Sequence, residues 1–422
     1  MRLRSTTSAI RPSCRIRRWS NPEDRDTHHW LRRLEARDFR NLAHTELAIP
    51  AGGMAIVGDN GQGKTNFLEA VAYLHLLRSV RGARDVEVVR FGEAGFHIRG
   101  EASFGGMVPP AAARVVALGF ERASRRKRVT VEGAIPRRLS DALGAVPSVT
   151  FAPVDAEMVR GGPVARRRYL DVTLATTSRR YLTALQAYRG GLLQRNTALR
   201  SLARGSGRGQ ARGESEAAAA AWEPLLAESG AVLWAERAAW AARWGPELAR
   251  ISAAIGERGV VQMRHVMRHS AAPDVDRDDA ASPGELAGVL AEALEAGRAG
   301  DVRHGATRVG PHRDDLVLTL GGRDMRTYGS AGQQRTAAIA LRILEAGTLR
   351  LGTGAAPVLL FDDPFAELDE GRSRAILDVL GGENVGQVIL AVPRAADIPV
   401  GLTRLARCTI VDGVVRAMGV AA

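Results

Sequence analysis

The chain is short of cysteine, of lysine and of long apolar runs. Its two cysteines, Cys14 and Cys408, lie at opposite ends of 422 residues, which excludes a disulfide scaffold and a cysteine-based zinc site. No uncharged apolar run approaches the roughly 20 residues that span a bilayer, so we expect no integral membrane protein and a cytoplasmic location. Only Lys64 and Lys127 are lysines among 59 basic residues, so a lysine in this chain marks a position where arginine does not serve.

What is present suits a large globular chain with an anionic partner. At roughly 150 residues per domain the length predicts two to three domains, and 45% apolar residues provide ample core. The net charge of +13 favours a polyanion such as nucleic acid. Residues 1–30 are rich in arginine and lack periodicity, so they are expected to be a disordered basic extension. An organellar transit peptide has this composition too, but a start codon chosen too far upstream explains it better.

Hydrophobic periodicity and turn signals give a coarse order of elements. Strands are predicted at 31–39, 44–49, 54–57, 316–320, 358–361 and 388–392. Helices are predicted at 65–77, 166–200, 214–255, 285–298, 330–347 and 368–380. The segment 358–392 therefore has the βαβ pattern of a parallel sheet, and a hairpin is expected around Asp412-Gly413.

The sharpest signal is a phosphate-binding loop. It runs Gly58, Asp59, Asn60, Gly61, Gln62, Gly63, Lys64 and Thr65, between a predicted strand and a predicted helix. Its glycines let backbone N–H groups close around phosphates at a helix N-terminus, while Lys64 reaches the β- and γ-phosphates and Thr65 ligates Mg²⁺. A glycine-rich turn with a solvent lysine is the alternative. The lysine itself argues against that alternative, because a guanidinium does not replace a compact ammonium here.

Two further motifs lie downstream of the phosphate loop, and the one nearer the C-terminus is described first. Asp362 and Asp363 end the apolar strand 358–361, where Asp362 would hold Mg²⁺ and Asp363 would act as the catalytic residue that orients or deprotonates the attacking water. Alone, they fit a capped strand end equally well. The third motif opens a helix with an exposed N-terminus and comprises Ser330, Gly332, Gln333 and Arg335. Alone, it would be an ordinary N-cap.

Together the three motifs have the layout of ABC-type ATPases, in which the serine-bearing helix of one subunit acts in trans on the nucleotide held by another. About 265 residues separate the phosphate loop from Ser330, which excludes the transporter branch, and no sustained heptads support an SMC-type coiled coil.

The chain resembles the RecF family from about residue 31 to 390. The matching strings are at 38–41, 58–70, 151–171, 194–196, 310–316, 328–338 and 361–372. The resemblance implies an α/β fold: an ABC-type ATPase head with a mixed or parallel sheet and an inserted, mainly helical lobe. It divides the chain into head residues 31–160, a helical lobe 161–299 and head residues 300–422. It also adds Arg40, Asn41 and Asn66 to the nucleotide-binding residues.

The same resemblance implies a function. The family's pattern is an ATP-dependent homodimer with Mg²⁺ that binds DNA near junctions of single and double strands. It helps to load recombinase together with RecO and RecR, and slow ATP hydrolysis serves as a switch. The chain departs from the family at Phe361, at Ala366 and at Val392-Pro393-Arg394, and the last of these leaves the hydrolysis rate open.

DNA contact is expected from charge. The segment from Arg160 to Arg212 contains twelve arginines and a single acidic residue, Asp171. A solvated helix face is the alternative, but the lack of balancing acids favours phosphate contacts. The candidates are Arg166, Arg167, Arg168, Arg179 and Arg180. The second basic patch, Arg122 and Arg125–Arg128, is expected to blunt a hairpin edge.

Other interpretations are less favourable. His312, Asp314 and Asp315 are too close together on a strand to face one ion, so they are expected to be structural or near the nucleotide. An ATPase-coupled nuclease would need an additional acidic metal-binding domain, for which nothing after residue 400 has room. An SMC-like tether would need coiled coil. The sequence favours a DNA-binding switch with weak ATPase activity.

Overall fold

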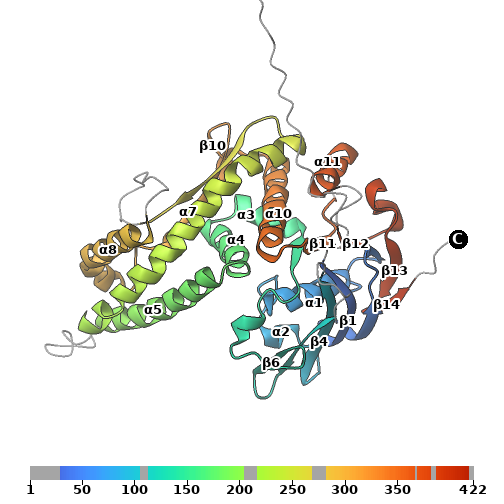
Figure 1. Cartoon of the computed structure of the whole chain (residues 1–422), viewed down its shortest axis with the longest axis horizontal. Coiled ribbons are helices and arrows are strands. Elements are labelled where there is room, and N and C mark those ends of the chain that lie inside the picture. The colour runs from blue at the N-terminus through green and yellow to red at the C-terminus, as the bar shows by residue number, and fades with distance from the viewer. Residues whose placement is uncertain are drawn as a thin grey trace, which may run out of the picture.

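The computed structural model describes residues 29–104, 113–203, 216–268, 282–365, 368–381 and 386–417. The expected extension 1–30 therefore lies outside the described residues, except for its last two. Figure 1 shows long helices gathered on one side of the molecule and the two larger sheets on the other. We call the sheet-bearing part the head. The helical lobe consists of α5 (Arg179–Ala203), α7 (Glu223–Ala254) and α8 (Pro283–His304).

A six-stranded sheet forms the centre of the head. Its order is β14-β13-β3-β12-β11-β7, and all neighbours pair in parallel except β14 with β13. The strands are β3 (Gly53–Val57), β7 (Ser148–Phe151), β11 (Val358–Asp362), β12 (Val388–Val392), β13 (Ala406–Val411) and β14 (Val414–Ala417). The central strands are apolar throughout because both faces of this sheet are covered. The expected mixed sheet is confirmed.

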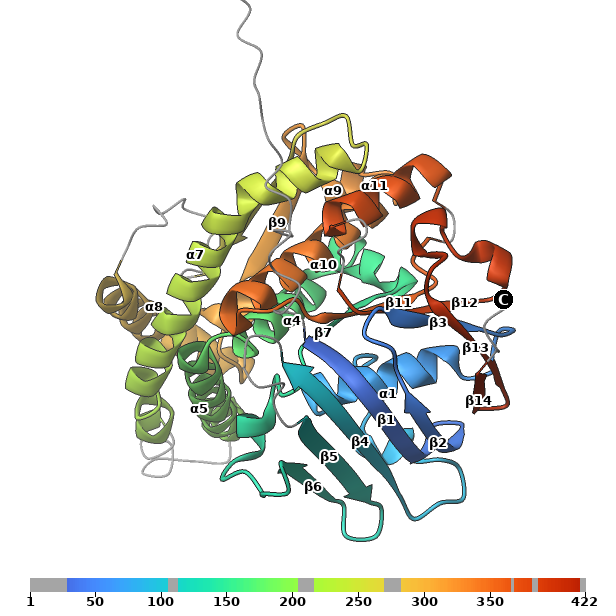
Figure 2. The same cartoon turned by 45° about the vertical axis from the view of Figure 1, so that its right-hand side comes forward.

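One face of the central sheet packs on α1 (Lys64–Leu76), of whose 13 residues ten are buried. A second sheet covers the far side of α1, with the antiparallel order β2-β1-β4-β5-β6 (Figure 2). Its strands are β1 (His29–Phe39), β2 (Leu42–Ala48), β4 (Gly95–Phe104), β5 (Arg114–Glu121) and β6 (Arg126–Val131). The helix α1 is thus held between two sheets, so the loop before it has a rigid support.

The other face of the central sheet packs on three further helices. These are α4 (Pro163–Ala175), α10 (Ala331–Thr353) and α11 (Glu370–Leu380), which share one core with the helical lobe. A three-stranded sheet completes this half, comprising β8 (Val261–Val266), β9 (Asp315–Leu320) and β10 (Arg323–Asp324). The short helices α2 (Asp85–Val88), α3 (Glu157–Arg160) and α9 (Met325–Tyr328) connect the larger elements.

Most predicted elements are confirmed, including the hairpin at Asp412-Gly413, where both residues have positive φ. The helix predicted at 166–200 is two helices, because Thr176 and Thr177 hydroxyls bond carbonyls of α4 and Ser178 Oγ accepts from the Tyr181 N–H of α5.

The helix beginning after Ser330 does not end at Gly347, which is buried inside it; Gly354, at φ 78°, ends it. The strand β8 is not predicted from the sequence, because its buried residues do not alternate regularly. It pairs with β9, so strand pairing crosses the expected lobe boundary at residue 299. No helix among the described residues combines the length and the apolar composition needed to cross a bilayer.

Candidate nucleotide site

The phosphate loop joins β3 to α1 at the carboxyl edge of the central sheet. Gly61 and Gly63 have φ values of 84° and 113°, which side chains with a Cβ rarely adopt. A Cβ on Gly58 would lie 2.5 Å from the Ile410 carbonyl oxygen. The Lys64 Nζ donates to the carbonyls of Gly58 at 2.5 Å and Asp59 at 2.9 Å, so the ammonium lies inside the curve of the loop. Burial lowers the pKa of Lys64, while nearby carboxylates oppose this.

Side chains outside the loop hold its shape. The Gln62 carbonyl accepts from the Gly413 N–H at 2.9 Å and from Asn41 Nδ2 at 3.1 Å. The Gln62 Oε1 accepts from the Asp412 N–H at 2.7 Å, so the terminal hairpin braces the loop. Asn66 Nδ2 donates to Asn41 Oδ1 at 2.8 Å. Asn41 and Asn66 line the cavity beside the loop, but Gln62 does not, so its observed contacts support the loop.

Arg40 ties the turn between β1 and β2 to α1. The Nε and Nη2 of Arg40 each donate at 3.0 Å to one oxygen of Glu69, a carboxylate buried in α1. The Glu69 carboxylate also accepts from Ser79 and lies 3.7 Å from Arg81 Nη1. Arg40 and Arg81 therefore reach the same cavity with their positions fixed by one buried acid.

The two aspartates meet the phosphate loop, as predicted. The Thr65 Oγ1 donates to Asp362 Oδ1 at 2.9 Å across 297 residues of sequence. Strand β12 alone lies between β3 and β11, so the carboxyl ends of all three converge here. Burial raises the pKa of Asp362; the Thr65 hydrogen bond opposes this and the Asp363 carboxylate adds to it. Asp363 has φ 48° and its N–H donates to the Ala391 carbonyl at 3.0 Å.

These residues surround a cavity of about 880 Å³. One hydroxyl and two carboxylates at its edge form the hard-oxygen set that suits Mg²⁺, so Thr65 and Asp362 fit the metal role expected of them. The lining also includes Arg81, Phe91, Arg122 and Pro153, which sequence reasoning missed. The Phe91 ring is 99% exposed, and a solvent-facing aromatic in a connecting loop has no periodic signal in the sequence.

The Ser330 motif lies elsewhere in the chain's own fold. The Ser330 Oγ accepts from the Gln333 N–H at 3.3 Å and Gln333 Oε1 accepts from the Ser330 N–H at 2.9 Å, which caps α10. Ser330 and Gly332 are exposed, and no residue of the motif lines the nucleotide cavity of the same chain. Arg335 Nη2 donates to the Pro364 carbonyl at 3.1 Å, next to the aspartates. Action in trans therefore stays a prediction.

The departures from the family pattern have different local explanations. Phe361 is fully buried and its ring packs 4.7 Å from that of Phe151, so the larger side chain fills space between β11 and β7. After β12, Arg394 Nη2 donates to Asp397 Oδ1 at 3.0 Å and the side chain is 78% exposed. Ala366 lies outside the described residues.

The expectation that Arg166 contacts DNA is wrong. The residue is 4% exposed, and its Nε and Nη2 donate to the two oxygens of Asp315 at 2.7 and 2.8 Å. Neighbours that looked unbalanced in sequence also meet acids from other elements: Arg179 pairs with Asp141, and Arg195 pairs with Glu223 and Asp301. The local charge count misled because tertiary structure supplies the missing carboxylates. Arg167 is half-buried, and Arg168, Arg179 and Arg180 are exposed.

The second basic patch lies on the β5–β6 hairpin, and β6 is the edge strand of its sheet, as expected. Lys127 has a structural role there. Its Nζ donates to the Leu77 carbonyl at 2.7 Å, pairs with Asp85 at 2.6 Å and lies over the Tyr73 ring. The ammonium thus caps the end of α1.

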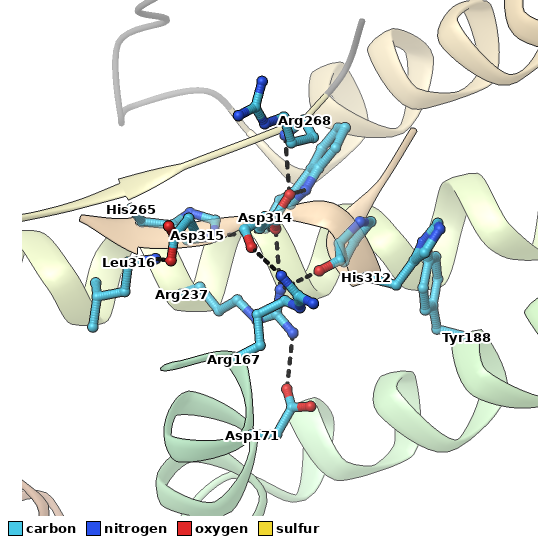
Figure 3. A network of polar contacts seen from close by, with 12 residues as sticks. Arg167, Asp171, Tyr188, Arg237, His265, Arg268, His312, Asp314, Asp315 and Leu316 are labelled. Carbon is cyan, nitrogen blue, oxygen red and sulfur yellow. Dashed lines mark hydrogen bonds and ion pairs between the residues drawn. The ribbon is translucent and has the colours of Figure 1, made fainter. Parts of the chain in front are cut away.

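Figure 3 shows that each of the three residues His312, Asp314 and Asp315 has its own set of partners. Asp315 holds Arg166, and His312 Nδ1 lies 2.7 Å from the Tyr188 hydroxyl. Asp314 is fully buried and accepts from Trp234, Arg237 and the Arg268 N–H, and lies 3.1 Å from His265 Nε2. These residues were expected to be either structural or near the nucleotide, and their contacts are structural. Among the described residues no group of three or more His, Cys, Asp or Glu side chains could hold a metal.

Comparison with known proteins places the chain in a family. No family model matches it. It is 38% identical over 347 residues to the DNA replication and repair protein RecF of Anaeromyxobacter dehalogenans (strain 2CP-C), covering 82% of this chain and 88% of that protein. It is 37% identical over 374 residues to the protein of the same name from Acidothermus cellulolyticus, covering 88% and 96%.

Solved structures agree. One of the recombination mediator protein RecF-ATP in the RecFOR pathway is 28% identical, with a TM-score of 0.80 over 93% of this chain and 98% of that one. The Smc head domain of Pyrococcus furiosus, 15% identical with a TM-score of 0.51 over 92% and 96%, shares the fold alone. The fold is that of an ABC-type ATPase head, and the chain belongs to the RecF family.

Proposed function

We propose that the chain is an ATP-switched DNA-binding protein of DNA replication and recombinational repair that acts in the cytoplasm. The observation that carries this is the Thr65–Asp362 hydrogen bond of 2.9 Å at the mouth of the nucleotide cavity. It joins the phosphate loop to the aspartate strand in a chain 38% identical to a protein named for DNA replication and repair. ATP with Mg²⁺ is the proposed ligand.

In the proposed site each residue has one task. The loop N–H groups and Lys64 bind the phosphates, and Thr65 and Asp362 hold Mg²⁺, which offsets phosphate charge when it is bound. Asp363 orients the attacking water and accepts its proton. Slow hydrolysis would serve as the switch, as in the family pattern.

The site becomes complete in a homodimer. Ser330, Gly332, Gln333 and Arg335 lie outside their own chain's nucleotide cavity, while Ser330 and Gly332 are exposed at the start of α10. A second copy would place this N-terminus against the γ-phosphate, where backbone donors and the helix dipole favour an anion. ATP would then hold two copies together, and hydrolysis would release them.

DNA is the proposed polyanion, bound near junctions of single and double strands. Because Arg166 is buried, it is no longer a candidate for DNA contact. The proposed contacts are Arg167, Arg168, Arg179 and Arg180. RecO and RecR are the proposed partners in recombinase loading, as in the family pattern.

Anisotropy of a labelled gapped duplex, measured with ATP, with ADP and without nucleotide, tests this function. We expect ATP to tighten binding by at least about tenfold and the effect to vanish in Lys64→Arg. DNA binding that is absent, or equal in all three nucleotide states, would contradict the proposal.

A further inference from the structure

A cavity of about 520 Å³ lies between the head and the helical lobe, away from the phosphate loop. Its walls come from the loop after α1, from α4, α5 and α7, and from the turn at 311–313. Among the described residues its lining contains one carboxylate, that of Asp171, against five arginines: Arg78, Arg167, Arg168, Arg189 and Arg237.

The Asp171 carboxylate is already committed to two of these arginines. Its Oδ1 accepts from the Tyr181 hydroxyl at 2.6 Å and from Arg237 Nη2 at 2.8 Å. Its Oδ2 accepts from Arg189 Nη2 at 2.8 Å. Arg237 is held from its other side by Asp314 Oδ2 at 3.0 Å (Figure 3). Both buried acids are thus satisfied before the remaining three arginines are considered.

Among the described residues, those three arginines form no hydrogen bond or ion pair with a carboxylate, although carboxylates act on two of them from farther away. Arg167 Nη1 donates to the Asp314 backbone carbonyl at 2.6 Å, and Arg168 Nη2 donates to the Val80 carbonyl at 3.2 Å. Arg78 makes no hydrogen bond or ion pair with any described residue. Guanidinium groups that form no ion pair, gathered around a concave space, are the arrangement that an anion completes.

The like charges act on one another. Burial lowers the pKa of Arg78, and the guanidinium groups of Arg168 and Arg189 lower it further, while the Asp171 carboxylate opposes them. Burial also lowers the pKa of Arg167, with Arg237 as the next cause, while the carboxylates of Asp314, Asp315 and Asp171 oppose this. The backbone permits this crowding: Gly82 has φ 81°, and a Cβ there would lie 3.1 Å from Arg168 Nη1. Repulsion of this kind is relieved when a multivalent anion enters.

We propose that this cavity binds a phosphate group, supplied either by the backbone of bound DNA or by a free phosphate. A tetrahedral oxyanion accepts from several guanidinium forks at once, which a single carboxylate does not. The DNA source rests on the proposed function, whereas the free-phosphate source does not. Arg78 lies two residues after the end of α1, the helix that begins at the phosphate loop.

The first arm of the test uses inorganic phosphate. Thermal unfolding of the full chain is followed against phosphate concentration, with Mg²⁺ and ADP occupying the phosphate loop and sodium chloride matching ionic strength. We expect the apparent Kd for phosphate to rise about tenfold in Arg78→Gln and in Arg168→Gln, and less in Arg78→Lys. Arg33→Gln is the matched control, because Arg33 is an exposed arginine that pairs with Glu46 on the far sheet.

The second arm uses a duplex and the chain with ATP and Mg²⁺ bound, at several salt concentrations. If a DNA phosphate enters the cavity, log Kd should depend less steeply on log salt in Arg78→Gln, by about 0.9 for each DNA phosphate that the variant no longer neutralises. Arg33→Gln should keep the full slope.

The two parts of the experiment distinguish free phosphate from the DNA backbone as the source of the bound phosphate group. A phosphate effect with unchanged DNA binding supports the site with a free phosphate as ligand, and a changed salt slope supports it with DNA as ligand. An unmodified chain that binds no DNA but shows the phosphate effect would end the proposed function and leave this site standing. If Arg78→Gln and Arg168→Gln match the Arg33→Gln control in both arms, the cavity is not a phosphate site.

Discussion

At the residue scale, Lys64 lies in a position that geometry reserves for an ammonium. Its side chain is 7% exposed and reaches two carbonyls of the loop, at 2.5 and 2.9 Å. The wider, planar guanidinium of arginine does not fit inside this curve. We therefore expect Lys64→Arg to weaken ATP binding by at least tenfold, about 1.4 kcal/mol.

Isothermal titration with ATP and Mg²⁺ measures this loss. Lys127→Arg is the control, since it makes the same change at the other lysine, where the ammonium caps α1 through the Leu77 carbonyl. Equal ATP affinity in Lys64→Arg and the unmodified chain would remove the phosphate-loop role.

A second residue-scale prediction concerns Asp363. Its φ of 48° lies in the left-handed region, which asparagine tolerates well among residues with a side chain. Asp363→Asn should therefore keep the backbone and the ATP affinity while removing the proton acceptor. We expect turnover to fall about 100-fold. A phosphate-release assay beside an ATP titration checks this; unchanged turnover would take the catalytic role from Asp363.

The nucleotide residues could be predicted from the sequence because they are contiguous or follow a recognisable strand. Phe91, Arg81 and Arg122 could not, because they reach the cavity only through the packing of separate loops and strands. The prediction for Arg166 was wrong for the same reason: its partner, Asp315, lies 149 residues away.

At the scale of elements, a substitution at the start of α10 tests whether this helix acts on the nucleotide bound by a second copy. Ser330 is exposed and caps the helix, so Ser330→Arg costs the cap about 1 kcal/mol and adds a bulky cation where a second copy must approach. ATP binding to the single chain should persist, whereas ATP-induced dimerisation should fail.

Ser282→Arg provides a matched control. Ser282 caps α8 with the same reciprocal bonds, to Glu285, so it loses a comparable cap in a different element. Dimerisation that survives in Ser330→Arg as fully as in Ser282→Arg would rule out the composite site.

The helix α1 carries a pH-sensitive group. His75 is fully buried between the sheets, neither ring nitrogen has a hydrogen-bond partner, and burial lowers its pKa from 6.5 to about 4. As pH falls below 6.5 the unfolded chain therefore binds the proton first, and the free energy of unfolding decreases until about pH 4.

His75→Leu should remove this contribution. Between pH 8 and pH 5 the unmodified chain should lose about 2 kcal/mol more stability than the variant. Urea unfolding at both pH values measures the difference, with the exposed His44→Leu as control. Parallel losses in His75→Leu and the unmodified chain would mean that His75 is not buried as a neutral ring.

Elements with strong periodicity or clear caps were predictable, such as β12, whose residues are all apolar, and α10, whose serine cap is visible in sequence. The irregular strand β8 and the break between α4 and α5 were not. Both depend on local hydrogen bonds or on a partner strand that the sequence window does not contain.

At the scale of the whole molecule, charge is organised by tertiary structure. Several arginines of the basic segment pair with acids of other elements, while an arginine cluster with one carboxylate lines the cavity where the head meets the lobe. This cavity is therefore one place where a polyanion would meet several arginines at once.

The central claim about this protein is that ATP binding brings two copies of the chain together. Sedimentation velocity of the unmodified chain, without nucleotide and with ATP and Mg²⁺, measures it. We predict a species of 45.1 kDa without nucleotide and one of twice that mass with ATP. A single mass in both conditions, whether monomer or dimer, would contradict an ATP-completed site shared by two copies.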